Sequence, residues 1–166
     1  QPGDVVADIG AGDGWWSKKM AEAVGSDGTV HAAEISDDKV DKLKQQYTDL
    51  PQLKPYKCPL DGTGLEPGSC DLVLFSKSFH HIATDVQSDY LKELKKVIRP
   101  DGRLVIIERH TGLSTGRDRD HAAQPGDLTK LVEENGWILV RYELITETRH
   151  FIAIYVQKEL FDEPGK

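Results

Sequence analysis

Short apolar runs alternate along the chain with segments whose hydrophobic residues recur at helical spacing. Residues 5–9 form one such run, and a cluster of glycines separates it from a helical pattern that includes Trp16 on its apolar stripe. A second run covers residues 29–35, after which Ser36 is expected to cap a second helix. This alternation predicts a layered α/β domain.

The middle of the chain continues the pattern with longer connections. Three more strands are expected there, at residues 53–58, 70–75 and 104–108. Thr84 with Gln87 predicts a capping box that opens a helix, and Pro100 ends that helix. Residues 109–125 read as a long polar loop.

Two apolar runs close the chain, at residues 137–145 and 151–156. The few polar residues between them are too short for a helical crossover, so these strands should pair antiparallel. Before them, Asp127 is expected to cap a short helix that ends at Gly136. The whole pattern predicts one α/β domain over residues 1–158, with a Rossmann-like, doubly wound, mostly parallel sheet of seven strands and a C-terminal antiparallel hairpin. Residues 159–166 are expected to form a frayed tail.

Composition narrows the classes of function. The 166 residues carry 28 acidic and 21 basic side chains, a net charge of −7, which disfavours nucleic acid as a partner. No apolar run approaches the roughly 20 residues that span a bilayer. The two cysteines, Cys58 and Cys70, form neither a Cys-x-x-Cys pair nor a zinc-ligand spacing, and no signal peptide is visible. We therefore expect a cytoplasmic protein without a metal site or a membrane anchor.

The strongest local signal lies between the first strand and the first helix. Asp8 is followed by glycines at alternate positions, Gly10, Gly12 and Gly14. Such a loop allows the backbone to turn sharply and to approach a ligand at the carboxyl edge of the sheet, where open α/β folds bind ligands. A merely tight turn is the alternative, although fewer glycines would serve it. NAD is disfavoured, because the last position of the dinucleotide fingerprint is occupied by the bulky Trp15.

Two further positions carry candidate chemistry. Glu34 ends the second strand, where an acid can accept hydrogen bonds from both ribose hydroxyls of an adenosine-containing ligand, although a solvated surface group is the simpler interpretation of an acid alone. His80 and His81 follow the 70–75 strand, and a histidine there could remove a proton from a substrate. The alternative is that one of the two caps the next helix and the other lines a pocket.

Four segments, in order, resemble the class I S-adenosylmethionine-dependent methyltransferases. They are VVADIGAGDGWWS, HAAEIS, CDLVLFSKSFHHI and RPDGRLVIIE. The resemblance covers almost the whole chain and is greatest to the small-molecule enzymes of the ubiquinone and menaquinone biosynthesis type. It implies S-adenosylmethionine as cofactor and methyl transfer to a small-molecule acceptor, with release of S-adenosylhomocysteine. A non-catalytic cofactor-binding domain or scaffold subunit is the alternative.

The resemblance also implies which residues bind the cofactor. They are Asp8, Gly10, Gly12, Gly14, Glu34, Ile35, Asp61, Gly62, Ser76 and Lys77. Glu34 would bind the ribose, Ile35 would lie along the adenine, and Asp61 with Gly62 would contact the adenine amino group. Ser76 and Lys77 would face the methionine portion. His80 is the candidate catalytic residue.

The region after the fifth strand often helps form the acceptor pocket in the resembling family. Here it contains a basic island of Arg109, His110, Arg117, Arg119 and His121. Its arginines favour an anionic acceptor, because guanidinium groups bind carboxylates in a bidentate manner. Asp118 and Asp120 could instead neutralise these arginines in a solvated loop. Typical relatives carry helices before the first strand that this sequence does not show, and a homodimer would be one way to complete such an open site.

Overall fold

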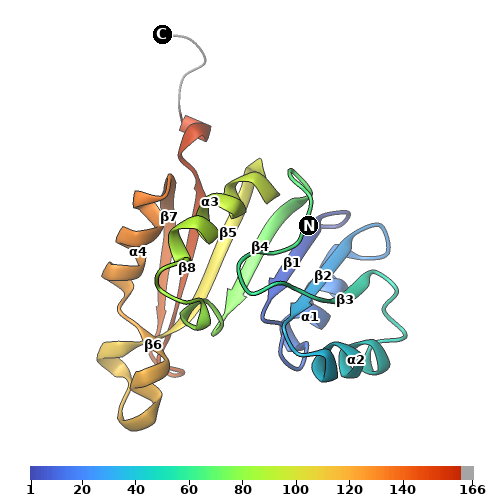
Figure 1. The fold of residues 1–166 in the computed structure, drawn as a ribbon, viewed down its shortest axis with the longest axis horizontal. Coiled ribbons are helices and arrows are strands. Elements are labelled where there is room, and N and C mark those ends of the chain that lie inside the picture. The colour runs from blue at the N-terminus through green and yellow to red at the C-terminus, as the bar shows by residue number, and fades with distance from the viewer. Residues whose placement is uncertain (162–166) are drawn as a thin grey trace.

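One twisted sheet organises the computed structural model, which describes residues 1–161 (Figure 1). The strands within these residues are β1 (Val5–Ile9), β2 (Thr29–Glu34), β3 (Leu53–Lys57), β4 (Cys70–Ser76), β5 (Ile98–His110), β6 (Ala122–Ala123), β7 (Trp137–Ile145) and β8 (His150–Gln157). Their order across the sheet is β3-β2-β1-β4-β5-β8-β7, and β6 pairs with β5 outside this path.

The strand directions confirm the predicted fold class. The neighbours among β1 to β5 are parallel, whereas β8 runs antiparallel to both β5 and β7. The seven predicted strands form the main path of the sheet, and the two-residue β6 is an addition within the expected polar loop.

Helices cover both faces of the sheet. They are α1 (Trp15–Val24), α2 (Asp37–Gln46), α3 (Gln87–Val97) and α4 (Pro125–Glu134). One core cluster joins Ala21 of α1 and Leu43 of α2 to Val6 of β1, and a larger cluster on the other face joins Leu91 of α3 and Val132 of α4 to the sheet. This is the doubly wound arrangement, in which successive side chains of a strand serve opposite faces.

The buried stripe of α1 differs from the prediction. Ser17, Ala21 and Val24 are its buried residues, whereas Trp16 is only half-buried. The helix is rotated because the Ser17 hydroxyl donates a hydrogen bond to the buried Asp8 Oδ2 at 2.6 Å. A polar contact therefore decides which face of α1 packs against the sheet.

Two predicted helix starts are also corrected. The capping box at Thr84 is not formed, since α3 begins at Gln87 and the Gln87 amide donates to the Ile82 carbonyl oxygen at 3.0 Å. α4 begins at Pro125 rather than after Asp127, which lies in its first turn. Proline at this position is favourable because the first helical N–H has no partner within the helix.

The turn expected between α3 and β5, at residues 99–103, is included in β5 as an irregular stretch of the strand. The pairing with β4 passes from Cys70–Ile98 directly to Leu72–Arg103, so the intervening residues bulge out of the ladder. At the other end of the chain, Lys158–Phe161 form a short 3₁₀ turn, and the rest of the predicted tail lies outside the described residues. None of the helices within residues 1–161 is long and apolar enough to cross a membrane.

Candidate functional site

A cleft of about 910 Å³ opens at the carboxyl ends of the parallel strands. Its lining residues follow the ends of β1, β2, β3, β4 and β5. The chain leaves β1 toward α1 on one face of the sheet and leaves β4 toward α3 on the other. Adjacent strands whose connections diverge in this way leave a crevice, which is where open α/β sheets bind their ligands.

The cleft has two halves, which differ in chemistry. The glycine half is lined by residues at or after the ends of β1, β2 and β3, namely Asp8, Ile9, Gly10, Ala11, Gly12, Asp13, Trp15, Trp16, Glu34, Ile35, Lys39, Cys58, Pro59 and Leu60. The histidine half is lined by residues from β4 onward, namely Phe75, Ser76, Lys77, Ser78, His80, His81, Ile82, Tyr90, Arg109, Asp118 and His121.

The loop after β1 brings two of the predicted glycines into the cleft. The N–H groups of Gly10 and Ala11 both donate to the Ala33 carbonyl oxygen, at 3.0 and 2.9 Å, which ties the loop to the end of β2. Gly12 has a φ of +60°, and a Cβ on it would meet no atom closer than 3.9 Å. A side chain at Gly12 would therefore occupy open space beside the cleft, whereas glycine leaves room for a ligand to approach the backbone.

Gly14 serves helix packing and does not line the cleft. It has a φ of +78°. A Cβ on Gly14 would lie 2.5 Å from Tyr47 Cε2 and 2.6 Å from Leu43 Cδ2. Glycine at this position allows the start of α1 to pack directly against α2.

Asp8 lies beneath the loop rather than on its surface. It is 1% exposed, and burial raises the pKa of its carboxyl group to about 6, although the hydrogen bond from Ser17 opposes this shift. Its carboxylate joins the end of β1 to α1. Asp8 thus holds the loop in place from below.

Glu34 is the central acid of the glycine half. Its side chain is 5% exposed, and its Oε2 accepts a hydrogen bond from the Gly12 N–H at 3.1 Å. Its Oε1 accepts from the Ile35 N–H at 2.9 Å, and Lys39 Nζ lies 3.5 Å from Oε2. The predicted acid and the predicted loop therefore meet directly. Beside them, Ile35 is an exposed apolar side chain that lines the cleft.

The structure places Asp61 and Gly62 outside the residues that line the cleft. The neighbouring Thr63 anchors this segment to α3, since its hydroxyl donates to Glu93 Oε1 at 2.7 Å. Of the segment after β3, it is Cys58, Pro59 and Leu60 that line the cleft, and Leu60 is 76% exposed. The sequence reasoning missed Leu60 because a lone apolar residue in a loop gives no signal of its own.

The turn after β4 brings Ser76 and Lys77 to the cleft. Lys77 has a φ of +57°, which is unusual for a residue other than glycine, and its N–H donates to the Ile107 carbonyl oxygen at 2.8 Å. Ser78 Oγ donates to the Ile9 carbonyl oxygen at 2.5 Å. These two hydrogen bonds join the end of β4 to β5 and to β1 at the floor of the cleft. A positive φ like that of Lys77 is often found at functional sites.

His80 forms a dyad with a residue that the sequence reasoning did not single out. Glu108, near the end of β5, is fully buried, and its Oε2 lies 2.9 Å from His80 Nδ1. The His80 backbone N–H also donates to Glu108 Oε1 at 3.3 Å. Burial raises the pKa of Glu108, and the nearby His80 opposes that shift. Because Glu108 engages Nδ1, the other ring nitrogen of His80 is free for a ligand.

Two more imidazole rings lie beside this dyad. The ring centroids of His81 and His121 lie 4.0 and 5.6 Å from that of His80. Arg109 lines the cleft and forms an ion pair with Asp118, whereas Arg117 and Arg119 are exposed and are not among the lining residues. The basic island predicted from the sequence therefore reaches the cleft through Arg109 and His121. Within residues 1–161, no group of three or more His, Cys, Asp and Glu side chains is arranged to hold a metal ion.

Three buried side-chain atoms in the described part of the chain have no hydrogen-bond partner. They are Ser76 Oγ, His80 Nε2 and His150 Nε2. Ser76 and His80 line the cleft, and His150 is paired in register with Arg109, which also lines it. Unsatisfied buried polar atoms are rare in folded proteins, so their concentration around the histidine half makes it a candidate place for ligand atoms.

Comparison with known proteins agrees with this geometry. The family model described as a methyltransferase domain matches residues 6–102. The chain belongs to this methyltransferase family. Its relatives and its fold agree with the resemblance to the class I S-adenosylmethionine-dependent methyltransferases.

Curated relatives of this methyltransferase domain match 65% of its length. An uncharacterised 37.1 kDa protein in transposon TN4556 of Streptomyces fradiae is 31% identical over 108 residues, and the match covers 31% of that protein. The demethylmenaquinone methyltransferase of Oceanobacillus iheyensis is 30% identical over 115 residues, and the match covers 45% of that protein. The chain thus spans less than half the length of these relatives.

Solved structures share the fold of the domain at low sequence identity. A SAM-dependent methyltransferase from Aquifex aeolicus has a TM-score of 0.86 and 20% identity, over 95% of this chain and 84% of that one. The methyltransferase CalH, crystallised with S-adenosylhomocysteine, has a TM-score of 0.79 and 17% identity, over 94% of this chain and 52% of that one.

Proposed function

We propose that this methyltransferase domain binds S-adenosylmethionine across the cleft and transfers its methyl group to a small-molecule acceptor, with release of S-adenosylhomocysteine. The observation that carries the proposal is the contact between Glu34 and Gly12. It places a buried carboxylate directly beside a glycine loop at the carboxyl edge of the sheet. That combination suits the ribose of an adenosine-containing ligand.

The residues present fit this cofactor. A cleft of about 910 Å³ lies within the range of small-molecule sites. The open space beside Gly12 accommodates close approach to the backbone, and the exposed Ile35 and Leu60 offer apolar surface for the adenine. The unpartnered Ser76 hydroxyl supports a polar ligand group at the methionine end.

We assign the cofactor-contacting roles to the predicted residues that line the cleft, namely Asp8, Gly10, Gly12, Glu34, Ile35, Ser76 and Lys77. Asp8 also supports the loop through its hydrogen bond with Ser17, and Gly14 acts through helix packing. Asp61 and Gly62 remain predicted adenine contacts, which would require the loop after β3 to move toward the cleft.

The histidine half is suited to receive the acceptor. The bound cofactor supplies an electrophilic methyl group on a sulfonium centre, so the chain has to align the acceptor atom and to accept its proton. His80 Nε2 is unpartnered and lines the cleft, while Nδ1 is held by Glu108. We assign His80 as the proton acceptor and Glu108 as the group that fixes its orientation.

A small acceptor is supported by the size of the cleft and by the acidic charge of the chain. The matched demethylmenaquinone methyltransferases of Bacillus mycoides and Oceanobacillus iheyensis, by their names, act on a small molecule. Cys58 and Cys70 are both buried and unbridged, which supports a reducing, cytoplasmic setting.

Calorimetric titration of S-adenosylmethionine and S-adenosylhomocysteine into the whole chain tests the proposal. We expect micromolar binding that weakens by about tenfold or more in Glu34→Gln, because the amide cannot accept both ribose hydrogen bonds. Glu22→Gln, an exposed change on α1, is the matched control and should bind as the wild type does. NAD should not bind. Absence of binding to the wild-type chain would overturn the proposal.

A further inference from the structure

The two edges of the sheet are protected very differently. β3 forms one edge, and three of its five residues, Lys54, Pro55 and Lys57, are of the kinds that block edge-to-edge pairing. β7 forms the other edge and has the sequence WILVRYELI, with neither lysine nor proline. Its pairing with β8 shifts register between Leu139 and Arg141 and is regular from Arg141 to Ile145. An edge strand of this kind presents unpaired backbone N–H and C=O groups to any further strand.

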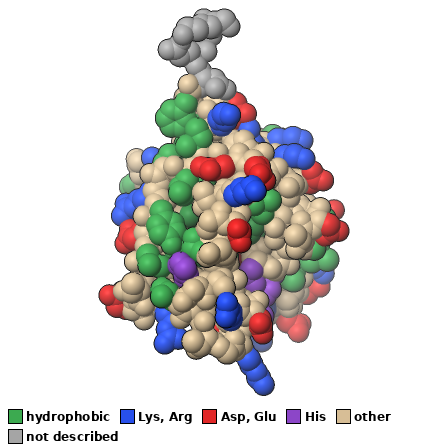
Figure 2. Space-filling model, turned by 90° about the vertical axis from the view of Figure 1, so that its left-hand side faces the viewer, with side chains coloured by type: hydrophobic (Ala, Val, Ile, Leu, Met, Phe, Trp, Pro, Cys, Tyr) green, Lys and Arg blue, Asp and Glu red, His purple; other side chains and the backbone are tan. Residues whose placement is uncertain are grey.

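The outer part of β7 is also unusually apolar for a surface. Val140, Tyr142 and Leu144 are 48%, 42% and 41% exposed. Figure 2 faces this side of the molecule and shows hydrophobic side chains gathered in a band. Exposed apolar surface on an unprotected edge indicates an interaction site.

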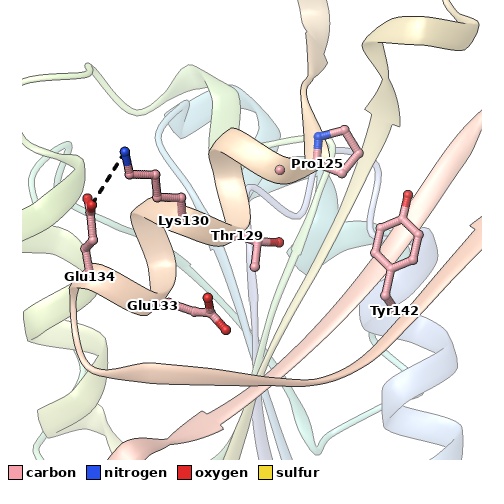
Figure 3. A pocket seen from close by; sticks show the side chains of 7 residues that line it. Pro125, Thr129, Lys130, Glu133, Glu134 and Tyr142 are labelled. Carbon is pink, nitrogen blue, oxygen red and sulfur yellow. Dashed lines mark ion pairs between the residues drawn. The ribbon is translucent and has the colours of Figure 1, made fainter.

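Tyr142 borders a groove between β7 and α4. Across this groove lie Pro125 and Thr129 of α4, and Lys130 and Glu134 form an ion pair farther along the helix (Figure 3). The groove has a volume of about 590 Å³. At Leu139, α4 reaches the edge strand, where Glu133 Oε1 accepts the backbone N–H at 3.5 Å. The segment from Val140 onward stays accessible.

The charges on β7 identify the kind of partner. Arg141 and Glu143 lie on one face of the strand and form an ion pair at 2.8 Å, while Tyr142 lies on the α4 face and stacks on Phe151. If two copies of β7 pair antiparallel about Tyr142, each Arg141 lies opposite the partner's Glu143. A two-fold interface requires such self-complementarity, since the same patch serves both subunits.

We propose that β7 is a homodimer interface, in which two copies of this chain join their sheets through antiparallel β7 strands centred on Tyr142. The observation that selects a second copy over another partner is the Arg141 and Glu143 pair, which this register matches twice. The interface lies at the far edge of the sheet from β3. It requires no cofactor and no part of the cleft.

Sedimentation velocity of the whole chain across a wide concentration range tests the proposal. We expect a species of twice the 18.5 kDa chain mass. Arg141→Glu alone and Glu143→Arg alone should each weaken dimerisation by about tenfold or more, because each places like charges opposite one another at two positions. Lys54→Glu on the opposite edge is the matched control and should leave the dimer unchanged.

Exchanging the charges at positions 141 and 143 gives the decisive test. An equimolar mixture of the Arg141→Glu and Glu143→Arg chains should regain the dimer, and so should the double variant, because both combinations restore opposite charges in this register. A wild-type chain that stays monomeric at every concentration would overturn the proposal. Dimerisation that survives both single changes, or that the mixture does not regain, would equally overturn it.

Discussion

In the glycine half of the cleft both buried carboxylates already hold partners, whereas in the histidine half two buried polar atoms hold none. Asp8 accepts a hydrogen bond from Ser17, and Glu34 accepts from Gly12 and Ile35. Ser76 Oγ and His80 Nε2, by contrast, are unpartnered among the residues that the structure describes. The hydrogen bonds of the glycine half hold its carboxylates in place, whereas the histidine half has polar atoms that a ligand could bind.

This difference matches the division of labour that the proposed function requires. A half that binds the same cofactor in every turnover would gain from being organised in advance, because less conformational freedom is lost on binding. A half that receives the acceptor must offer groups whose partners arrive with the substrate. The two halves should therefore respond differently to substitution.

Replacing His80 should give the largest effect and should separate the two halves most clearly. We expect His80→Ala to lower kcat for methyl transfer by about 100-fold or more, as loss of a general base typically does, with little change in cofactor affinity. The assay is transfer of labelled methyl from S-adenosylmethionine to an acceptor found by screening small molecules, with calorimetry of the cofactor beside it. His81→Ala is the matched control and should lose much less.

A companion change tests how His80 is held. Glu108→Gln keeps the shape of the side chain but removes the charge that holds Nδ1, so its rate should fall in the same direction by a smaller factor. The comparison of the two halves breaks down if His80→Ala retains full activity or weakens cofactor binding as strongly as it slows transfer.

Replacing Asp8 should give the next largest effect, and it concerns stability rather than rate. Burial raises the pKa of Asp8 from 3.8 to about 6 in the folded protein, so the folded state retains a proton that the unfolded chain releases over this interval. The resulting stabilisation is complete at low pH and is lost as the pH rises through about 6, which amounts to up to about 3 kcal/mol.

Asparagine cannot ionise, and it can still accept the Ser17 hydrogen bond. The free energy of unfolding of Asp8→Asn relative to wild type should therefore rise between about pH 4 and about pH 7, as measured by urea denaturation at each pH. Ser17→Ala removes a contact that lowers the Asp8 pKa and should extend the pH dependence to higher pH. A difference that stays level across this range would show that Asp8 does not resist ionisation.

The sequence brought Gly10, Gly12 and Glu34 together in one candidate site because their signals are local. Gly10 and Gly12 lie in one short loop, and Glu34 ends the strand next in sequence. Gly14 belongs to the same motif, yet its neighbours Leu43 and Tyr47 come from another helix, so its packing role could not be read from the loop. The apolar runs located the strands for a similar reason, since period-two patterns need only nearest neighbours in the chain.

The histidine half depends on contacts between distant segments. Glu108 lies 28 residues from His80 and looks like the last residue of a buried strand. The sequence assigns His121 to a basic island in a polar loop, but its place beside His80 depends on a 3₁₀ turn that the pattern did not predict. The failed capping box at Thr84 has the same origin, because Gln87 bonds to Ile82 instead. No local signal specified these partners.

The smallest effect should come from the arginines that the sequence favoured as acceptor ligands. Arg117 and Arg119 are exposed and do not line the cleft, whereas Arg109 does. We expect the double change Arg117→Ala with Arg119→Ala to alter the acceptor KM by less than about twofold, since exposed charges contribute little. Arg109→Ala should alter it more. If the double variant instead raises KM strongly, the segment over residues 116–121 closes onto the bound acceptor. The histidine half would then be completed by a moving segment and not only by the strand ends, which would make it still less like the glycine half.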